Sequence, residues 1–125
     1  MPFRVGIDLV AAVTVADALA AHGEHYLTRV YREGEIADCG GAAAPDPLRL
    51  AARFAAKEAA LKVLRAGDAA VPFSAIEVVR GPDGAPELTL HGPAAELAAA
   101  TGLTGFAVSL THERDYASAV VIAEA

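Results

Sequence analysis

The architecture of this chain is set from its centre, by the stretch Arg53-Phe-Ala-Ala-Lys-Glu-Ala-Ala-Leu-Lys62. Its spacing predicts the middle of a helix that runs from about Leu48 to Leu64. On a wheel of about 3.6 residues per turn, the large apolar residues form one stripe, made of Leu50, Phe54, Leu61 and Leu64. Charged residues flank this stripe, with Arg49 and Arg53 on one side and Glu58, Lys62 and Arg65 on the other.

Lys57 falls inside the apolar stripe itself. A dry and unpaired ammonium group would cost more free energy than a helix of this length could offset. We therefore predict that Lys57 has an acidic partner, either buried or at an interface.

Length and composition predict one globular domain over residues 1–125, because 54% of the residues are hydrophobic and such a chain can bury a sizeable core. The single cysteine excludes an internal disulfide framework and a multi-cysteine zinc site, as expected in a reducing cytoplasm. No stretch resembles a signal peptide or a membrane span, so we expect a cytoplasmic protein without a membrane partner. The net charge of -6 argues against a nucleic-acid partner, since phosphate backbones require clustered cations.

Strand-like and helical patterns alternate around the central helix. We predict strands at residues 3–10, 73–79, 87–91, 106–111 and 117–123, and shorter helices at 13–21, 24–31 and 93–101. The Pro-Asp-Gly sequence at 82–84 predicts a hairpin between the second and third strands. Thr14 is expected to cap the first helix, Gly23 to end it, and Gly67 to end the central helix.

Asp8 lies where a β-rich run gives way to an alanine-rich segment, which predicts a carboxylate at a strand end. A functional acid often occupies such a place, although a helix cap or a turn acid is the plainer explanation. Together with Glu58 and the helix cations, Asp8 would suit Mg²⁺ beside a phosphate, because Mg²⁺ prefers one or two carboxylates together with phosphate oxygens.

Arg49, Arg53 and Lys57 recur at i, i+4 and i+8, where like charges repel each other within a helix. Either this row faces a polyanion such as a phosphorylated ligand, or each cation has an acid on a neighbouring element. Glu58 and Lys62 form an i, i+4 pair, which is usually a solvated surface pair unless it belongs to the same site.

His112 ends a predicted strand directly after Ser109 and Thr111. A hydrolase built on Ser109 and His112 is an alternative, although no strand-turn-helix elbow surrounds either hydroxyl group. Cys39 has no motif that would activate it and is expected to be an inert thiol. The remaining histidines are expected to have structural roles, and they are His22, His25 and His91.

Several motifs follow one another along the chain: Gly6-Ile-Asp8, Arg53-Phe-Ala-Ala-Lys-Glu-Ala with Lys62, Ile76-Glu-Val with Gly84-Ala-Pro86, Val108-Ser-Leu-Thr-His112 with Tyr116-Ala, and Val120-Val-Ile-Ala-Glu124. In order and spacing they resemble holo-acyl-carrier-protein synthase, the small trimeric class of 4′-phosphopantetheinyl transferases. The resemblance covers nearly the whole chain. It implies an α+β fold in which an antiparallel sheet packs against a long central helix with shorter helices.

The resemblance also implies an activity, the transfer of 4′-phosphopantetheine from coenzyme A to a serine of an apo acyl carrier protein, which releases adenosine 3′,5′-bisphosphate. Asp8 and Glu58 would hold Mg²⁺ and Lys62 would neutralise the pyrophosphate, so these three residues would carry catalysis. Glu58, or a water on the metal, would take the serine proton. The implied coenzyme A contacts, some from a neighbouring subunit of a homotrimer, are Arg53, Lys62, Gly84, Pro86, Ser109, Thr111 and His112.

Two departures from the family pattern concern the partners. The family usually carries arginines on its first helix to grip the acidic carrier, whereas residues 12–21 contain no Lys or Arg. Ala85 also stands where a lysine is common. We therefore predict an active transferase with an altered carrier preference: a less acidic carrier, apolar contacts, or docking on Arg29 and Arg32. The alternative is a non-catalytic trimeric module that binds coenzyme A. The carrier's pathway, whether fatty-acid, polyketide or another, is left open.

Overall fold

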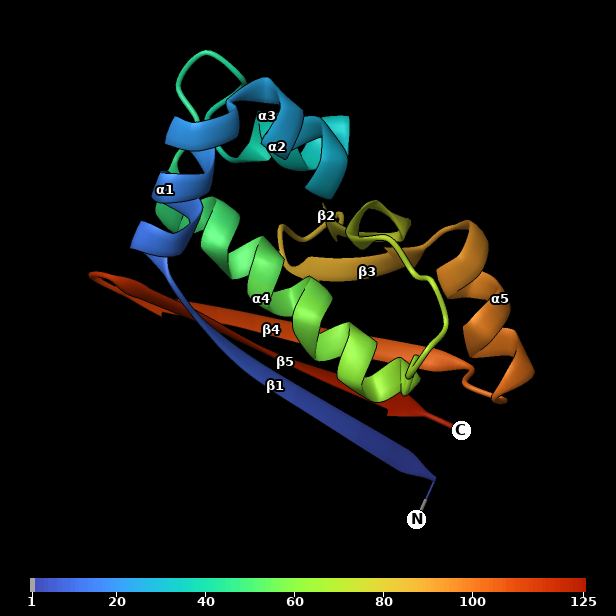
Figure 1. Ribbon diagram of the computed structural model, residues 1–125. Coiled ribbons are helices and arrows are strands. Elements are labelled where there is room, and N and C mark those ends of the chain that lie inside the picture. Colours follow the sequence, from blue (N-terminus) through green and yellow to red (C-terminus); the bar gives the residue numbers. More distant parts are fainter. Residues whose placement is uncertain (1) are drawn as a thin grey trace.

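The computed structural model describes residues 2–125 as an α+β fold in which one long helix lies between a sheet and a group of shorter helices (Figure 1). The elements, in chain order, are β1 (Phe3–Ala11), α1 (Ala12–His22), α2 (Glu24–Val30), α3 (Glu33–Asp38), α4 (Pro47–Leu64), the 3₁₀ turn η1 (Phe73–Ala75), β2 (Ile76–Arg80), β3 (Pro86–Leu90), α5 (Gly92–Ala100), β4 (Gly105–Glu113) and β5 (Tyr116–Glu124). The fold class predicted from the sequence is confirmed.

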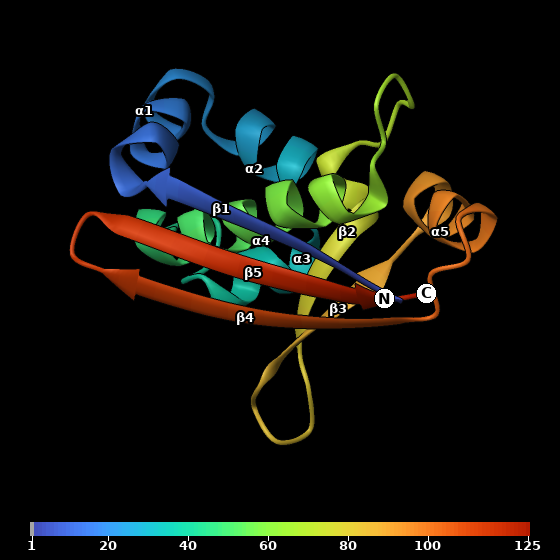
Figure 2. The same ribbon diagram turned by 90° about the horizontal axis from the view of Figure 1, so that it is seen from below.

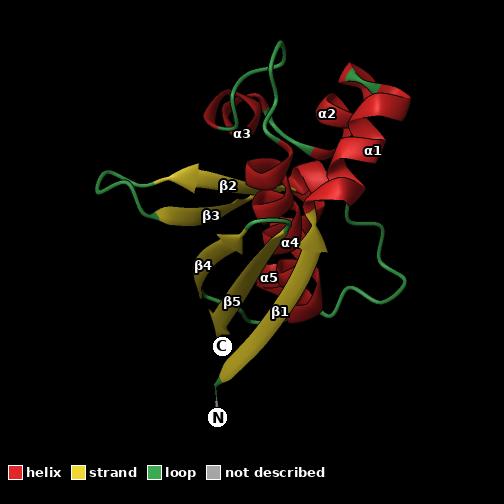
Figure 3. Cartoon of the chain, turned by 90° about the vertical axis from the view of Figure 1, so that its left-hand side faces the viewer, coloured by secondary structure: helices red, strands yellow, loops and turns green. Residues whose placement is uncertain are grey.

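The sheet against which α4 packs has three antiparallel strands in the order β1-β5-β4. Strands β2 and β3 form a separate antiparallel hairpin, in which Ile76 faces Leu90 and Arg80 faces Pro86. Figure 3 shows this hairpin projecting to the side of the three-stranded sheet. Helix α5 follows the hairpin and leads into β4. The predicted hairpin is confirmed, although residues 73–75 form a 3₁₀ turn and the strand begins only at Ile76.

The two faces of the sheet differ because side chains alternate along a strand. The inner face packs on α4 through small and branched residues of β5, namely Ala117, Ala119, Val121 and Ala123. The outer face leaves large apolar side chains exposed, namely Phe3, Val5, Ile7, Leu9, Tyr116 and Ile122. In Figure 2, which views the molecule from below, no described element covers this outer face.

Helix α4 begins as the sequence predicts, because the Asp46 carboxylate accepts a hydrogen bond from the Leu48 N–H at 2.9 Å and Pro47 occupies the first turn. Its burial differs from the predicted apolar stripe. Leu50 and Leu64 are fully buried, whereas Phe54 and Leu61 are only half-buried. Most of the buried surface is supplied instead by small residues around the helix: Ala51, Ala52, Ala55, Ala56, Ala59, Ala60 and Val63.

Gly6 explains why this alanine-rich helix lies so close to β1. A Cβ atom added at Gly6 would lie 2.2 Å from the Ala59 carbonyl oxygen and 3.1 Å from a methyl group of Val63. Any larger residue would therefore push the strand away from the helix. The close approach also brings the residues that follow Gly6 on β1 within reach of the last turns of α4.

Three predicted element ends are wrong. The N-cap of α1 is Ala11 without a side-chain cap, so Thr14 does not cap that helix, although Gly23 ends it as predicted. Helix α4 ends at Arg65 in the left-handed conformation, before Gly67 is reached. Strand β1 continues to Ala11, so Asp8 does not lie at a strand end.

The acidic partner predicted for Lys57 is Glu35, on helix α3. The two side chains are fully buried, and the Lys57 ammonium lies 2.8 Å from Glu35 Oε1. Lys57 also donates to the carbonyl groups of Phe73 (3.1 Å) and Ile76. Glu35 in turn accepts the Val78 N–H at 3.0 Å. This buried ion pair therefore ties α3 and α4 to the start of the hairpin.

Helix α3 itself was not predicted, because its residues precede a stretch rich in glycine and alanine that favours a loop.

Across residues 2–125, no helix combines the length and the apolar composition that a bilayer crossing requires.

Candidate functional site

Asp8, Glu58 and Lys62 come together where β1 packs against α4. The Lys62 ammonium donates to the carbonyl of Ile7 at 2.7 Å and lies 3.5 Å from Asp8 Oδ1. The side chains of Lys62 and Asp8 are 55% and 22% exposed, so a ligand can reach both. Asp8 is therefore neither a helix cap nor a turn acid, and Lys62 contacts the strand in addition to following Glu58 by four positions on the helix.

The Glu58 carboxyl is electrostatically coupled to its two neighbours. Partial burial raises the pKa of Glu58 above its ordinary value, the negative charge of Asp8 raises it further, and the positive charge of Lys62 lowers it. The two carboxylates are therefore close enough to repel each other, and a cation bound by both would relieve this repulsion.

We expect the metal-free protein to show this coupling in a carboxyl ¹³C NMR titration. The pKa of Glu58 should lie above the ordinary glutamate value, and Asp8→Asn should lower it because one negative charge is removed. Lys62→Met should raise it further. A protonated Glu58 cannot accept a proton, so any reaction that uses it as a base should slow as the pH falls through this raised pKa. A Glu58 pKa at or below the ordinary value would contradict this account.

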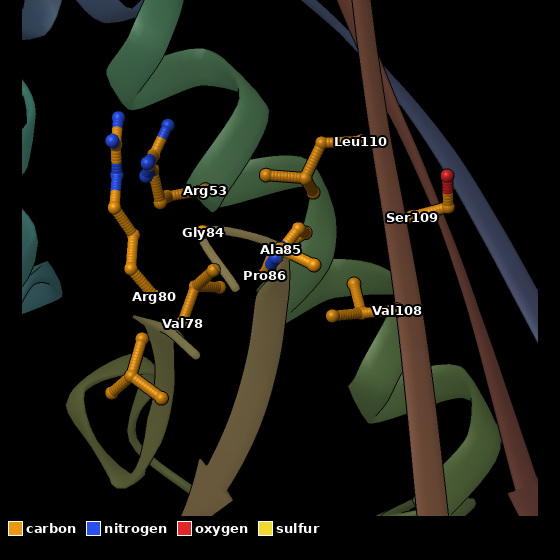
Figure 4. A pocket seen from close by; sticks show the side chains of 10 residues that line it. Arg53, Val78, Arg80, Gly84, Ala85, Pro86, Val108, Ser109 and Leu110 are labelled. Carbon is orange, nitrogen blue, oxygen red and sulfur yellow. The ribbon is translucent and has the colours of Figure 1, made fainter. Parts of the chain in front are cut away.

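A second group of predicted residues lines a pocket between the β2–β3 hairpin, α4 and β4 (Figure 4). Its volume is about 430 Å³, and its lining residues are Arg53, Val78, Val79, Arg80, Gly84, Ala85, Pro86, Val108, Ser109 and Leu110. Thr111, His112 and the cluster of Asp8, Glu58 and Lys62 do not line it. Within one chain, the predicted site residues therefore do not share a single pocket.

Within residues 2–125, the guanidinium group of Arg53 in this pocket lacks a full set of hydrogen-bond partners. It is 9% exposed, and within residues 2–125 its Nε atom is buried without a hydrogen-bond partner. Its terminal nitrogen makes only a long contact, 3.5 Å, to the carbonyl of Arg49. A buried guanidinium nitrogen without an acceptor is costly, so the pocket suits an anionic group at Arg53.

The row of Arg49, Arg53 and Lys57 is therefore not a single anion-binding surface. Arg49 lies 3.5 Å from the carboxylate of Asp46, and Lys57 is paired with Glu35. Two of the three cations have acids of their own, and Arg53 alone faces the pocket.

The hydrolase alternative is wrong. Ser109 and His112 stand at positions i and i+3 of one continuous strand, so their side chains point to opposite faces of the sheet. Figure 4 shows the Ser109 hydroxyl pointing away from the pocket. Cys39 is fully buried, and burial raises its pKa to about 11, which agrees with an inert thiol. His91 lies 2.8 Å from Glu77 and so has a structural partner.

Comparison with known proteins assigns the chain to a family. The model of the 4′-phosphopantetheinyl transferase superfamily matches residues 4–121. The chain belongs to this superfamily. It is 44% identical over 120 residues to the holo-[acyl-carrier-protein] synthase of Carboxydothermus hydrogenoformans, with 96% of each chain covered. It is also 44% identical over 122 residues to the synthase of Solidesulfovibrio magneticus, again with 96% of each chain covered.

Solved structures of superfamily members have the same fold. The holo-[acyl-carrier-protein] synthase of Helicobacter pylori in complex with coenzyme A matches with a TM-score of 0.84 and 26% identity, over 97% of this chain and 100% of the other. The ACPS–CoA complex of Chronobacterium ammoniagenes matches with a TM-score of 0.82 and 30% identity, over 99% of this chain and 98% of the other. The sequence-based assignment to the phosphopantetheinyl transferases is confirmed.

Arg80 is a residue of the pocket around Arg53 that sequence reasoning missed. It is exposed, ends β2, and in Figure 4 its side chain extends in the same direction as that of Arg53. The signal in the sequence was its position directly before the Gly81-Pro-Asp-Gly84 turn, which projects the residue toward whatever the hairpin contacts.

Proposed function

We propose that this chain transfers the 4′-phosphopantetheine group of coenzyme A to a serine of an apo acyl carrier protein, releasing adenosine 3′,5′-bisphosphate. The observation that carries the proposal is the gathering of Asp8, Glu58 and Lys62 at the contact between β1 and α4. Two coupled carboxylates beside a lysine suit phosphoryl transfer, whereas nucleotide binding alone requires only cations.

The donor set fits Mg²⁺. Within residues 2–125, His, Cys, Asp and Glu do not form a group of three or more that would hold a metal by themselves. Mg²⁺ prefers one or two carboxylates and takes its other ligands from phosphate oxygens and water. Asp8 and Glu58 would therefore hold the ion together with the substrate, and the ion would supply positive charge to the phosphoryl oxygens.

The chain's own groups have distinct tasks in the transfer. The carrier serine hydroxyl attacks the phosphorus that bears pantetheine, a new P–O bond forms, and the P–O bond to the leaving adenosine 3′,5′-bisphosphate breaks. Glu58 is the chain's own group that would accept the serine proton. Lys62, oriented by Ile7 and Asp8, stabilises the negative charge that develops on the bridging oxygen.

The pocket around Arg53 is proposed to hold the nucleotide part of coenzyme A. Arg53 and Arg80 would bind its ribose phosphate, and Gly84 and Pro86 would lie against it in the turn that also contains Ala85. Ser109, Thr111 and His112 are proposed contacts from the sequence. Of these three, only Ser109 lines the pocket of a single chain, so Thr111 and His112 require a ligand that extends beyond it.

A homotrimer would unite the two parts of the site. The outer face of the sheet exposes several large apolar side chains side by side, and contiguous patches of this kind mark interaction surfaces. We propose that a second copy packs there and that neighbouring subunits together complete the site. Sedimentation of the purified chain measures whether the protein is a trimer.

Carrier docking is proposed to differ from the usual pattern. The exposed side of α1 presents Val13, 61% exposed, together with Thr14 and Asp17, and carries no lysine or arginine. Arg32 is held by the carbonyl of Ser74 at 2.7 Å, whereas Arg29 is exposed and available to an acidic carrier. The proposed partner is a carrier protein that binds largely through apolar contacts. Transfer of phosphopantetheine to a panel of apo carriers tests the whole proposal.

A further inference from the structure

The end of α4 carries an arginine in a backbone conformation that usually belongs to glycine. Arg65 is the C-cap residue, with φ 51° and ψ 50°, and its N–H donates to the carbonyl of Lys62 at 3.3 Å. In this left-handed region a Cβ atom crowds the backbone, so glycine or asparagine is the usual choice. The positive charge suits the negative end of the helix, but lysine would serve that purpose as well.

Arg65 lines the same pocket as two of the proposed transfer groups. This pocket, about 400 Å³ in volume, is lined by Glu58 and Lys62 on α4 and by Arg65 at its end. The remaining wall is mostly apolar and comes from Leu61, Ala66, Gly67, Ala69 and Val71. A ligand bound at Glu58 and Lys62 would therefore pass close to the Arg65 side chain.

The two cations of this pocket differ in how their charges are matched. Lys62 has the Asp8 carboxylate at 3.5 Å and the Ile7 carbonyl at 2.7 Å. Within residues 2–125, no carboxylate forms an ion pair with Arg65, whose side chain is exposed. The carboxylates of Asp8 and Glu58 balance the charges of Lys62 and Arg65 in number, but within residues 2–125 neither of them pairs with Arg65, so its guanidinium donors face the pocket's ligand space without an ionic partner.

We propose that Arg65 is a further phosphate-binding residue of the transfer site, which binds the adenosine-side phosphate of the coenzyme A pyrophosphate while Glu58 and Lys62 act at the pantetheine-side phosphorus. The inference rests on the proposed function. A guanidinium group binds phosphate through two parallel N–H donors, which an ammonium group cannot do. This geometry accounts for arginine at a position where the backbone favours glycine.

The test is Arg65→Gly, measured as the dissociation constant for coenzyme A by isothermal titration calorimetry. Glycine suits the left-handed conformation, so the variant should unfold at the same urea concentration as the wild type or a higher one. The dissociation constant should rise about tenfold, equivalent to about 1.4 kcal/mol. Arg65→Lys should give an intermediate value, because it keeps the charge but not the paired donors.

Arg114→Gly is a matched control. Among residues 2–125, Arg114 is the other non-glycine residue with a positive φ, also 51°, and it lies in the turn between β4 and β5, outside this pocket. The substitution makes the same change in charge and backbone, and its affinity for coenzyme A should equal that of the wild type.

Unchanged coenzyme A affinity in Arg65→Gly would overturn the inference, as would a loss that appears only as a higher KM for the carrier protein. The binding measurement does not depend on turnover. A wild type that binds coenzyme A and responds to Arg65→Gly, but modifies no carrier, would therefore contradict the proposed function and leave the role of Arg65 standing. A wild type without coenzyme A affinity would overturn both.

Discussion

Glu58→Gln is expected to lower kcat for phosphopantetheine transfer by about 10²–10⁴-fold, because it removes both a proposed metal ligand and the proposed proton acceptor. The fold should survive, since Glu58 is half-buried and the amide is of the same size. Affinity for coenzyme A should change little, because the nucleotide is bound mainly by cations. Initial rates with saturating coenzyme A and carrier, together with urea unfolding, measure these quantities.

Glu96→Gln provides the matched control, because Glu96 is an exposed glutamate on a helix surface, α5, away from the site. Its kcat should equal that of the wild type. The experiment also separates the transferase from a non-catalytic module that binds coenzyme A, since such a module has no turnover to lose. Glu58→Gln with kcat within a few-fold of the wild type would remove Glu58 from the mechanism.

Glu35→Gln is expected to cause the largest loss of stability, about 3–5 kcal/mol in the free energy of unfolding. The substitution leaves the ammonium group of Lys57 fully buried without its counter-charge. Burial already lowers the pKa of Lys57, and the charge of Glu35 is the main opposing influence. The glutamine also weakens the hydrogen bonds to the backbone N–H groups of Arg32 and Val78.

Urea unfolding with a constant m-value measures this loss, and Glu33→Gln on the same helix is its control because that side chain is exposed. Lys57→Met should be similarly destabilising, since it isolates the Glu35 carboxylate. The double variant should lose less than the sum of the two single losses, because removal of both charges leaves neither unpaired. Additive losses, or a loss below about 1 kcal/mol for either single variant, would show that the pair contributes little.

Local signals in the sequence were sufficient to predict most of the fold. The 3.6-residue periodicity of the central helix, the Asp46-Pro47 start and the Pro-Asp-Gly turn act through neighbouring residues, and the structure has each of them. The burial of α4 was not predictable in this way, because its closest contacts depend on Gly6, more than 50 residues away. A helical wheel that marks only the large apolar residues does not identify a buried face made of alanines that pack against a glycine.

The candidate site was likewise predictable where local sequence signals sufficed, and not where distant contacts decide the structure. A charged residue inside the apolar stripe was enough to predict an acid for Lys57, but not to find Glu35, because α3 lies in a stretch of weak helix signals. Asp8 and Glu58 were joined first by their residue types, as a possible Mg²⁺ site, and then by the family resemblance. The packing of β1 on α4 gives the physical reason for their proximity. Their catalytic roles remain predictions. Arg80 and Arg65 were missed because turn and cap positions do not by themselves indicate binding.

Mass spectrometry of apo acyl carrier proteins, incubated with this protein, coenzyme A and Mg²⁺, tests the central claim most directly. At least one carrier should gain the mass of phosphopantetheine on its serine, and chelation of the divalent ion should prevent the gain. If no carrier in a broad panel of fatty-acid, polyketide and other types gains that mass, the proposed transferase activity is contradicted.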